Sequence, residues 1–224
     1  MQSFFIFYFS LIAFQVLRRK RQRLNIIFSS FFISIIIANI LNMIYAALDN
    51  VILILILNFF TNFFLCFGPI FILIVNIIIL ESTVIFPVKR QNRYILLYSL
   101  LLLFGMSPFY FLGGVTVEYN APRFNLLFLV YVISFSAAFA VFPMIYTSLK
   151  IYSSFKSKAL KKKWLFYILG FLGSVSIAYL VFLNNYIFKP NFRLIVAIYS
   201  ISVILWGFLM YYGIGFKLKD KTLS

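Results

Sequence analysis

The chain has no histidine, one cysteine and only four acidic residues among its 224 residues. Without histidine, neither a Ser-His catalytic triad nor a histidine-ligated metal or haem of the usual kinds can form. The single thiol, Cys66, excludes an internal disulfide, and its place inside an apolar run indicates a small buried side chain. The acids, Asp49, Glu81, Glu118 and Asp220, are too scattered to favour a carboxylate metal site. We therefore expect no enzymatic activity, no metal and no cofactor.

The chain also lacks the means to make a water-soluble surface. Charged residues are 11% of the sequence and hydrophobic residues 64%, whereas a soluble domain has about 25% and 45–50%. The formal net charge of +16 lies at the edges of apolar runs rather than on a polar domain, so we expect no nucleic-acid partner. Anionic lipid headgroups are the expected partners, since each basic residue near a membrane surface gains about 1 kcal/mol.

Seven apolar runs separated by short polar gaps predict seven transmembrane helices. A helix that crosses the hydrocarbon needs about 20 residues, so seven of them leave no room for a soluble domain. We expect an all-α, multi-pass bundle in the cell membrane, with residues 1–224 forming one domain. The predicted spans are residues 3–17, 25–48, 51–80, 94–112, 126–149, 164–188 and 194–216. The first is the shortest, and the third contains Gly68-Pro69, which predicts a kink.

Basic residues alternate along the chain in a way that predicts its direction. Seventeen of the 20 lysines and arginines follow the first, third, fifth and seventh runs. Cytoplasmic loops retain lysine and arginine, so the N-terminus is expected outside and the C-terminus in the cytoplasm. No basic segment precedes the first apolar run, and no cleavable signal peptide is predicted. The strongest expected cytoplasmic clusters are Arg18, Arg19, Lys20 and Arg21, and Lys161, Lys162 and Lys163.

Polar residues in the second and third runs recur at helical spacing. At about 100° per residue, each run places its polar residues within one quadrant, and polar side chains in lipid face protein or water. The stripes are Asn39, Asn42 and Asp49 in the second run, and Asn58, Asn62, Cys66 and Asn76 in the third. They predict an interhelical hydrogen-bond seam, if they face each other. Its function is either structural or that of a polar pocket opening outward, formed by Asn39, Asn42, Asp49, Asn58 and Asn62.

Small residues in the sixth run predict close helix packing. Gly170, Ser174 and Ala178 recur every four residues, with Gly173 beside them. Small side chains at this spacing let two membrane helices approach closely. We interpret this face as a packing surface within the bundle, and dimerisation is the alternative.

Two connections carry further expectations. Aromatic and small residues at helical spacing in residues 150–163 predict that the fifth helix continues into the cytoplasm. Residues 115–125 form the longest outer loop, which is too small for a domain. No β-strands are predicted there or elsewhere.

Three local features carry a resemblance to a known family. They are the basic cluster 18–21 after a short first helix, residues 158–163 leading into Trp164 and Gly170, and Tyr211-Tyr212-Gly213-Ile214-Gly215 at the end of the last helix. In these the chain resembles the seven-helix sensor regions that precede archaeal and bacterial histidine kinases, and their stand-alone relatives. The resemblance to G-protein-coupled receptors is one of topology alone, because their motifs are absent.

The sensor resemblance implies ligand sensing and signal relay through the last helix. Eight residues follow that helix in this sequence, so we expect no attached kinase and a relay through a separate cytoplasmic partner. We therefore expect a sensor or receptor-like module for a small apolar or amphiphilic ligand entering from the outer leaflet. A transporter or channel component is the alternative, which Gly68-Pro69 and Pro143 support but the lack of internal repeats does not. A non-catalytic accessory subunit is the third hypothesis.

Overall fold

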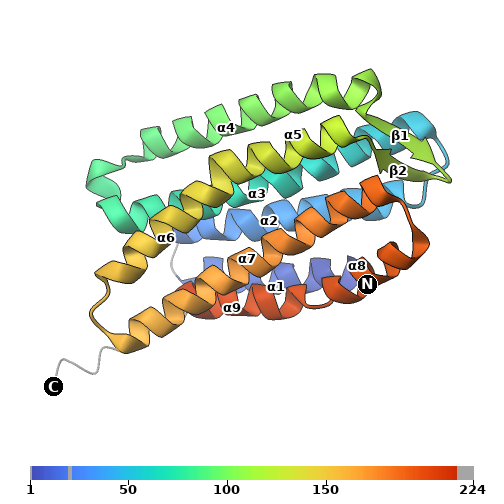
Figure 1. Cartoon of the computed structure of the whole chain (residues 1–224). Helices are drawn as coiled ribbons and strands as arrows, with labels where there is room; N and C mark the ends of the chain where they lie inside the picture. The colour runs from blue at the N-terminus through green and yellow to red at the C-terminus, as the bar shows by residue number, and fades with distance from the viewer. Residues whose placement is uncertain (1, 20–21, 216–224) are drawn as a thin grey trace.

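The computed structural model describes residues 2–19 and 22–215, without the side chains of residues 19, 82–84 and 215. Within these residues the chain folds into a bundle of helices with one small hairpin at one end (Figure 1). The elements are α1 (Gln2–Arg19), α2 (Arg23–Tyr45), α3 (Val51–Ile85), α4 (Val88–Phe109), the π-helical η1 (Tyr110–Gly114), β1 (Val115–Glu118), β2 (Ala121–Phe124), α5 (Leu126–Ser136), the π-helical η2 (Ala137–Val141), α6 (Phe142–Ser154), α7 (Lys158–Ile187), α8 (Pro190–Ser200) and α9 (Val203–Gly215).

Six helical stretches of the described chain are long and apolar enough to cross a membrane. They are Arg23–Tyr45, Val51–Glu81, Val88–Gly114, Leu126–Ser154, Lys158–Ile187 and Pro190–Ile214. The prediction of an all-α, multi-pass membrane bundle is thereby confirmed. The predicted first span corresponds to a shorter apolar helix, Gln2–Arg18, which packs along α2 and α9. The structure thus contains six full-length spans and one short helix beside them.

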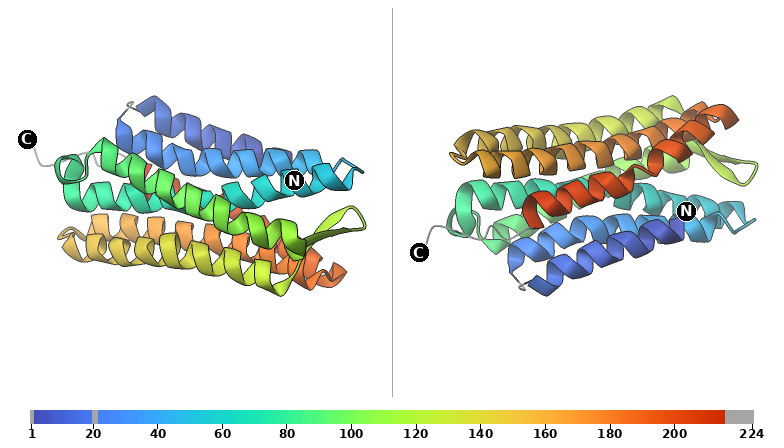
Figure 2. Two further views of the ribbon diagram at one scale, coloured as in Figure 1. Left: turned by 90° about the horizontal axis from the view of Figure 1, so that it is seen from above. Right: turned by 90° about the horizontal axis from the view of Figure 1, so that it is seen from below.

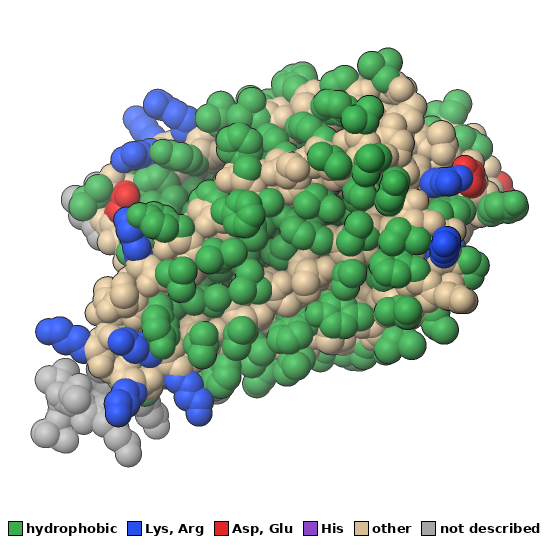
Figure 3. Space-filling model, viewed as in Figure 1, with side chains coloured by type: hydrophobic (Ala, Val, Ile, Leu, Met, Phe, Trp, Pro, Cys, Tyr) green, Lys and Arg blue, Asp and Glu red, His purple; other side chains and the backbone are tan. Residues whose placement is uncertain are grey.

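The surface of the bundle divides into an apolar middle and two charged ends. Figure 3 shows hydrophobic side chains over the middle of one face, and lysine and arginine at the two ends. Large apolar side chains such as Phe104 and Leu127 are 69% and 67% exposed. Apolar exposure on this scale suits lipid rather than water.

We name the two ends by their connections. The basic end carries the α1–α2, α3–α4 and α6–α7 connections, and the hairpin end carries β1, β2 and the α2–α3 and α7–α8 connections (Figure 1). The hairpin end holds Arg123, Lys189 and Arg193. All other described lysines and arginines lie towards the basic end, in residues 18–23, 89–93 and 150–163. Lys20, Arg21 and the tail from residue 216 lie outside the described residues.

Helix α3 forms the centre of the bundle. It contacts α2, α4, α5 and α6, and Ile72, Ile74 and Val75 are fully buried. The helix continues past Pro69 without ending. It extends to Ile85, five residues beyond the predicted span, because hydropathy marks the apolar part of a helix and not its end.

The two connections depart from their predictions. Residues 155–157 interrupt the helix predicted over 150–163, so α6 and α7 are joined by a turn. Residues 115–124 form an antiparallel hairpin although no strand was predicted. Its turn places Tyr119 and Asn120 at φ of 50° and 58°, which is the backbone of the tight turns that join twisted strands.

The last predicted helix is broken. It begins at Pro190, earlier than predicted, and a turn at residues 201–202 separates α8 from α9. Helix α9 packs against both α7 and α1, whereas α8 packs on α7. Figure 2 shows α8 diverging from α1 towards the hairpin end. This divergence positions the cavity described below.

Candidate functional site

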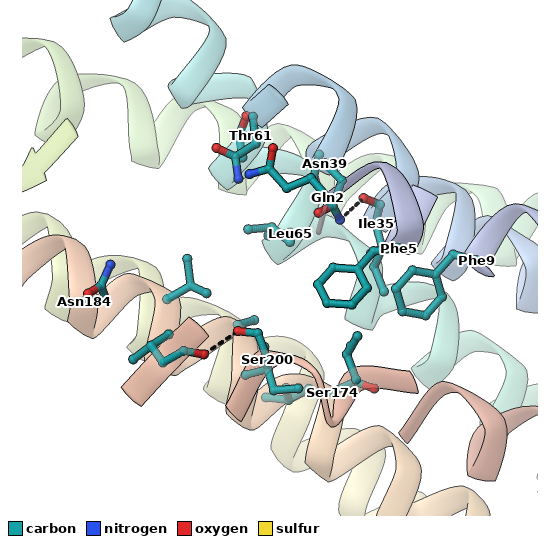
Figure 4. Close-up of a pocket in the computed structure, with 18 of the residues that line it drawn as sticks. Gln2, Phe5, Phe9, Ile35, Asn39, Thr61, Leu65, Ser174, Asn184 and Ser200 are labelled. Atoms are coloured by element: carbon teal, nitrogen blue, oxygen red, sulfur yellow. Dashed lines mark hydrogen bonds between the residues drawn. The ribbon is translucent and has the colours of Figure 1, made fainter. Parts of the chain in front are cut away.

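A cavity of about 260 Å³ lies in the hairpin-end half of the bundle. Its wall is formed by α1, α2 and α3 on one side and by α7, α8 and α9 on the other. Figure 4 shows Asn39, Thr61 and Leu65 across the cavity from Asn184 and Ser200. The cavity therefore lies between segments from the two ends of the sequence.

The part of the cavity nearest the hairpin end, which we call its mouth, is polar. Helices α2 and α7 end at the hairpin end, whereas α1 and α8 begin there, so each lining residue's position in its helix gives its depth. Gln2, Asn42, Asn184 and Arg193 lie within one turn of these helix ends. Asn39 follows one turn further inside.

The floor of the cavity is apolar. Phe9, Phe31, Pro69, Val175 and Val203 line it further from the hairpin end. Such a cavity, polar at the mouth and apolar below, matches the shape of an amphiphile.

The hydroxyl groups in the wall are already paired within their own helices. Ser174 donates to the Gly170 carbonyl at 2.9 Å, and Ser200 donates to the Val196 carbonyl at 2.7 Å. Thr61 does the same in α3. A hydroxyl paired in this way presents little polarity to a ligand, so the deep wall is apolar in practice.

Two groups at the mouth are incompletely paired. The Asn184 Oδ1 atom is buried without a hydrogen-bond partner, alone among the side-chain atoms of the described residues. The described residues contain one ion pair, Arg123 with Glu118 at 2.8 Å, so Arg193 has no carboxylate partner among them. Its guanidinium lies 5.1 Å from the centre of the Phe188 ring. An unpaired buried carbonyl costs free energy, whereas the guanidinium of Arg193 is on an exposed residue.

The five seam residues predicted from the sequence fall into three separate places. Asn39 and Asn42 line the cavity. Asn58 and Asn62 are buried elsewhere, where Asn62 donates to the Asn58 Oδ1 at 2.9 Å. Asp49 is exposed and accepts a hydrogen bond from Asn120 of the hairpin turn. The structure therefore assembles no single five-residue pocket.

Asn58 is at the centre of a buried hydrogen-bond network. The Tyr110 hydroxyl donates to the Asn58 Oδ1 at 2.9 Å, and the Asn58 amide donates to the Tyr45 hydroxyl at 3.3 Å. These bonds join α2, α3 and η1 at the hairpin end. This part of the predicted seam has the geometry of structural hydrogen bonding between helices.

The small residues that were predicted to form one packing face of α7 lie on two different surfaces. Gly170 and Gly173 lie against α9, and a Cβ atom at Gly170 would be 2.6 Å from the Met210 nitrogen and the Trp206 oxygen. Ser174 and Ala178, on the same stripe, line the cavity instead. Close packing of α7 on α9 thus sits directly below the cavity.

A second polar cluster lies on the basic-end side of α3. The Asn76 amide donates to the Ser148 Oγ at 2.7 Å, and the Tyr167 hydroxyl donates to the Asn76 Oδ1 at 2.9 Å. The Trp164 indole donates to the Ser148 carbonyl at 2.9 Å. The cluster joins α3, α6 and α7, and every group in it is paired, which indicates a structural role.

The basic clusters lie against aromatic rings at the basic end. The ammonium groups of Lys161, Lys162 and Lys163 lie 5.5–5.9 Å from the centres of aromatic rings. Arg18 is exposed, and the side chain of Arg19 is not described. Aromatic rings beside lysines are typical of the membrane–water boundary. No three His, Cys, Asp or Glu side chains of the described residues come together to hold a metal ion.

Sequence reasoning missed Gln2, Asn184 and Arg193 as cavity residues. Each lies near a span end, where polar residues are ordinary, so position along the chain did not distinguish them. No protein-family model, curated protein or solved structure matches this chain.

Proposed function

We propose that this protein is a receptor-like module of the cell membrane that binds a small amphiphile in the cavity and relays its occupancy to a separate cytoplasmic partner. One observation carries the proposal. Ser200 and Val203 both line the cavity, and the break between α8 and α9 lies between them. A ligand in the cavity would therefore contact both halves of the broken helix.

The packing around the break supports a relay. Helix α9 is held on α7 through Gly170, and the Tyr8 hydroxyl of α1 donates to the Ile204 carbonyl at 2.7 Å. Helix α8 packs on α7. If α8 can adopt two positions, a ligand that binds one of them more tightly shifts the population of molecules towards that position. The size of the shift is set by the difference between the ligand's affinities for the two positions. Helices α1 and α9 then connect that shift to the basic end.

The proposal includes seven crossings, with the basic end in the cytoplasm. The segregation of nearly all described cations to one end supports this orientation. A 17-residue apolar helix is at the lower limit for a span, about 17–25 residues.

The test uses an impermeant maleimide on intact cells, in a Cys66→Ala background. Tyr119→Cys in the hairpin should react in intact cells, and Ser157→Cys should react only after the cells are permeabilised. The reverse pattern would refute the orientation.

A mutation that fills the cavity tests the relay without knowledge of the ligand. Ala178→Phe places a ring in the cavity from α7, and Ala197→Leu fills it from α8. The control is Ala138→Phe, because Ala138 is exposed on another helix. A spin label at Leu97 on α4 is the reference, and a second label is placed at one of two other positions. Pulsed electron resonance in nanodiscs measures the distribution of distances between the two labels.

A receptor requires that both reporter distances respond. We expect filling variants to shift the distance from Leu97 to Ile198 on α8 and also the distance from Leu97 to Phe208 on α9. The exposed-site control should shift neither. Movement of α8 without α9 would overturn the relay, and no movement in either filling variant would overturn the proposed function.

A carrier is the second candidate, favoured by the broken helix at the cavity. Transporters often line their sites with interrupted helices. A carrier should move a labelled single-chain amphiphile across proteoliposomes, whereas a receptor should bind it without net transfer. A fully packed interior would favour an accessory subunit without a site of its own. The cavity gives that hypothesis no such support.

A further inference from the structure

The charge at the mouth of the cavity is unbalanced. Two acids lie at the hairpin end, and both have partners: Glu118 pairs with Arg123, and Asp49 accepts from Asn120. Arg193 is the cation that lines the cavity. A guanidinium binds a carboxylate or phosphate through paired hydrogen bonds, and Arg193 is exposed, so an anionic headgroup can reach its donors.

The size of the cavity restricts the rest of the ligand. The cavity of about 260 Å³ is slightly smaller than the pockets that hold drug-sized ligands. Drug-sized ligands take about 300–1,000 Å³. A single aliphatic chain of medium length fits this space.

We infer that the cavity binds a single-chain amphiphile with an anionic headgroup, whose head pairs with Arg193 and whose chain lies between Phe9, Phe31 and Val175. This inference rests on the proposed function and names the ligand class of the same site. The chain follows the apolar floor described above, where Ser174 and Ser200 have their hydroxyls paired. The head meets the polar mouth.

The Asn184 amide completes the mouth. Its unpartnered Oδ1 lies on a residue near the end of α7, and Arg193 lies one turn into α8. A cationic or purely apolar ligand would leave Arg193 without an anion.

The test compares headgroups on a constant ten-carbon chain. The full-length protein in nanodiscs is mixed with radiolabelled decanoate, and bound label is measured against empty nanodiscs. Decyl phosphate, decanol and decyltrimethylammonium then compete. We expect decanoate and decyl phosphate to compete at least about tenfold better than decanol, a difference of about 1.4 kcal/mol. The cationic amphiphile should compete least, and a preference between the two anions identifies the acid group.

Two matched variants test whether Arg193 is the residue that binds the headgroup. Arg193→Gln should weaken decanoate binding about tenfold and leave decanol binding within about twofold. Arg123→Gln is the control, because Arg123 is at the same end but pairs with Glu118 and does not line the cavity. Thermal unfolding of both variants should match the wild type. Equal loss in both variants, or equal binding of decanol and decanoate by the wild type, would overturn the anionic site.

The cavity-filling variants separate this inference from the proposed function. Ala178→Phe and Ala197→Leu should abolish the binding of every ten-carbon probe. If decanoate still binds them as it binds wild type, the ligand lies elsewhere and the inference fails. If filling shifts the spin-label distances but headgroup charge makes no difference, the receptor survives and the ligand class is wrong.

Discussion

Gly170→Ala tests the packing on which the broken helix depends. A Cβ atom there would be 2.6 Å from the Met210 nitrogen and the Trp206 oxygen, both backbone atoms of α9. Carbon contacts are favourable at about 3.5–4.0 Å, so α7 and α9 would have to separate by roughly 1 Å. No rotamer change can relieve the clash, because the obstacles are backbone.

The expected cost follows from that separation. Overpacking a tight contact costs about 1–3 kcal/mol, and alanine gains back up to about 1 kcal/mol of helix propensity over glycine. We expect a net loss of about 1–2 kcal/mol for Gly170→Ala. The assay is reversible unfolding by SDS titration in mixed micelles, followed by tryptophan fluorescence, since Trp206 lies in the affected contact.

Gly68→Ala is the matched control. Its Cβ atom would be 3.3 Å from a carbon of the Phe31 ring, and Phe31 lines the cavity, so the ring has space into which to move. We expect a change within about 0.5 kcal/mol. If Gly68→Ala destabilises the protein as much as Gly170→Ala does, close backbone contact between α7 and α9 is not what stabilises this region.

Three further substitutions test the hydrogen bonds. Asn76→Leu leaves the buried Tyr167 hydroxyl without its acceptor, and should destabilise the protein by about 1–2 kcal/mol in the SDS titration. Tyr8→Phe removes the bond to the Ile204 carbonyl, and should cost about 0.6 kcal/mol while broadening the label distances from Leu97 to α9. Glu118→Gln breaks an ion pair whose side chains are 39–48% exposed, so the melting temperature should not change measurably; a clear fall would show that the hairpin is more important for stability than its exposure indicates.

The sequence was sufficient for the fold class because lipid imposes one dominant rule. Spanning segments must be apolar and helical, and the second run, predicted as 25–48, corresponds to Arg23–Tyr45. The boundaries were less accurate where helices leave the hydrocarbon. Helix α4 begins at Val88 rather than residue 94, because its first turns are basic and lie at the charged end, where hydropathy gives no signal.

Structural elements whose position depends on tertiary contacts could not be predicted from the sequence. The break between α8 and α9 occurs at Ile201-Ser202, with neither glycine nor proline to mark it. The turn coincides with the point where α9 begins to pack on α1 through the Tyr8 bond. The partner is nearly 200 residues away in the sequence, so no local pattern could have indicated it.

The seam shows why a helical stripe of amides does not by itself predict which residues line a cavity: Asn39 and Asn42 do, and Asn58 and Asn62 are buried elsewhere. Spacing places Asn42 and Asn58 on the inner faces of neighbouring helices, but the partner of each decides its role. Asn58 meets the Tyr110 hydroxyl and is satisfied, whereas Asn42 meets the cavity. Under the proposed orientation, Arg193 is a cation on the translocated side, where the positive-inside tendency disfavours it. A residue that departs from the rule which orders the rest of the chain, and which also lines a cavity, is a better pointer to a ligand than four asparagines that obey the helical period.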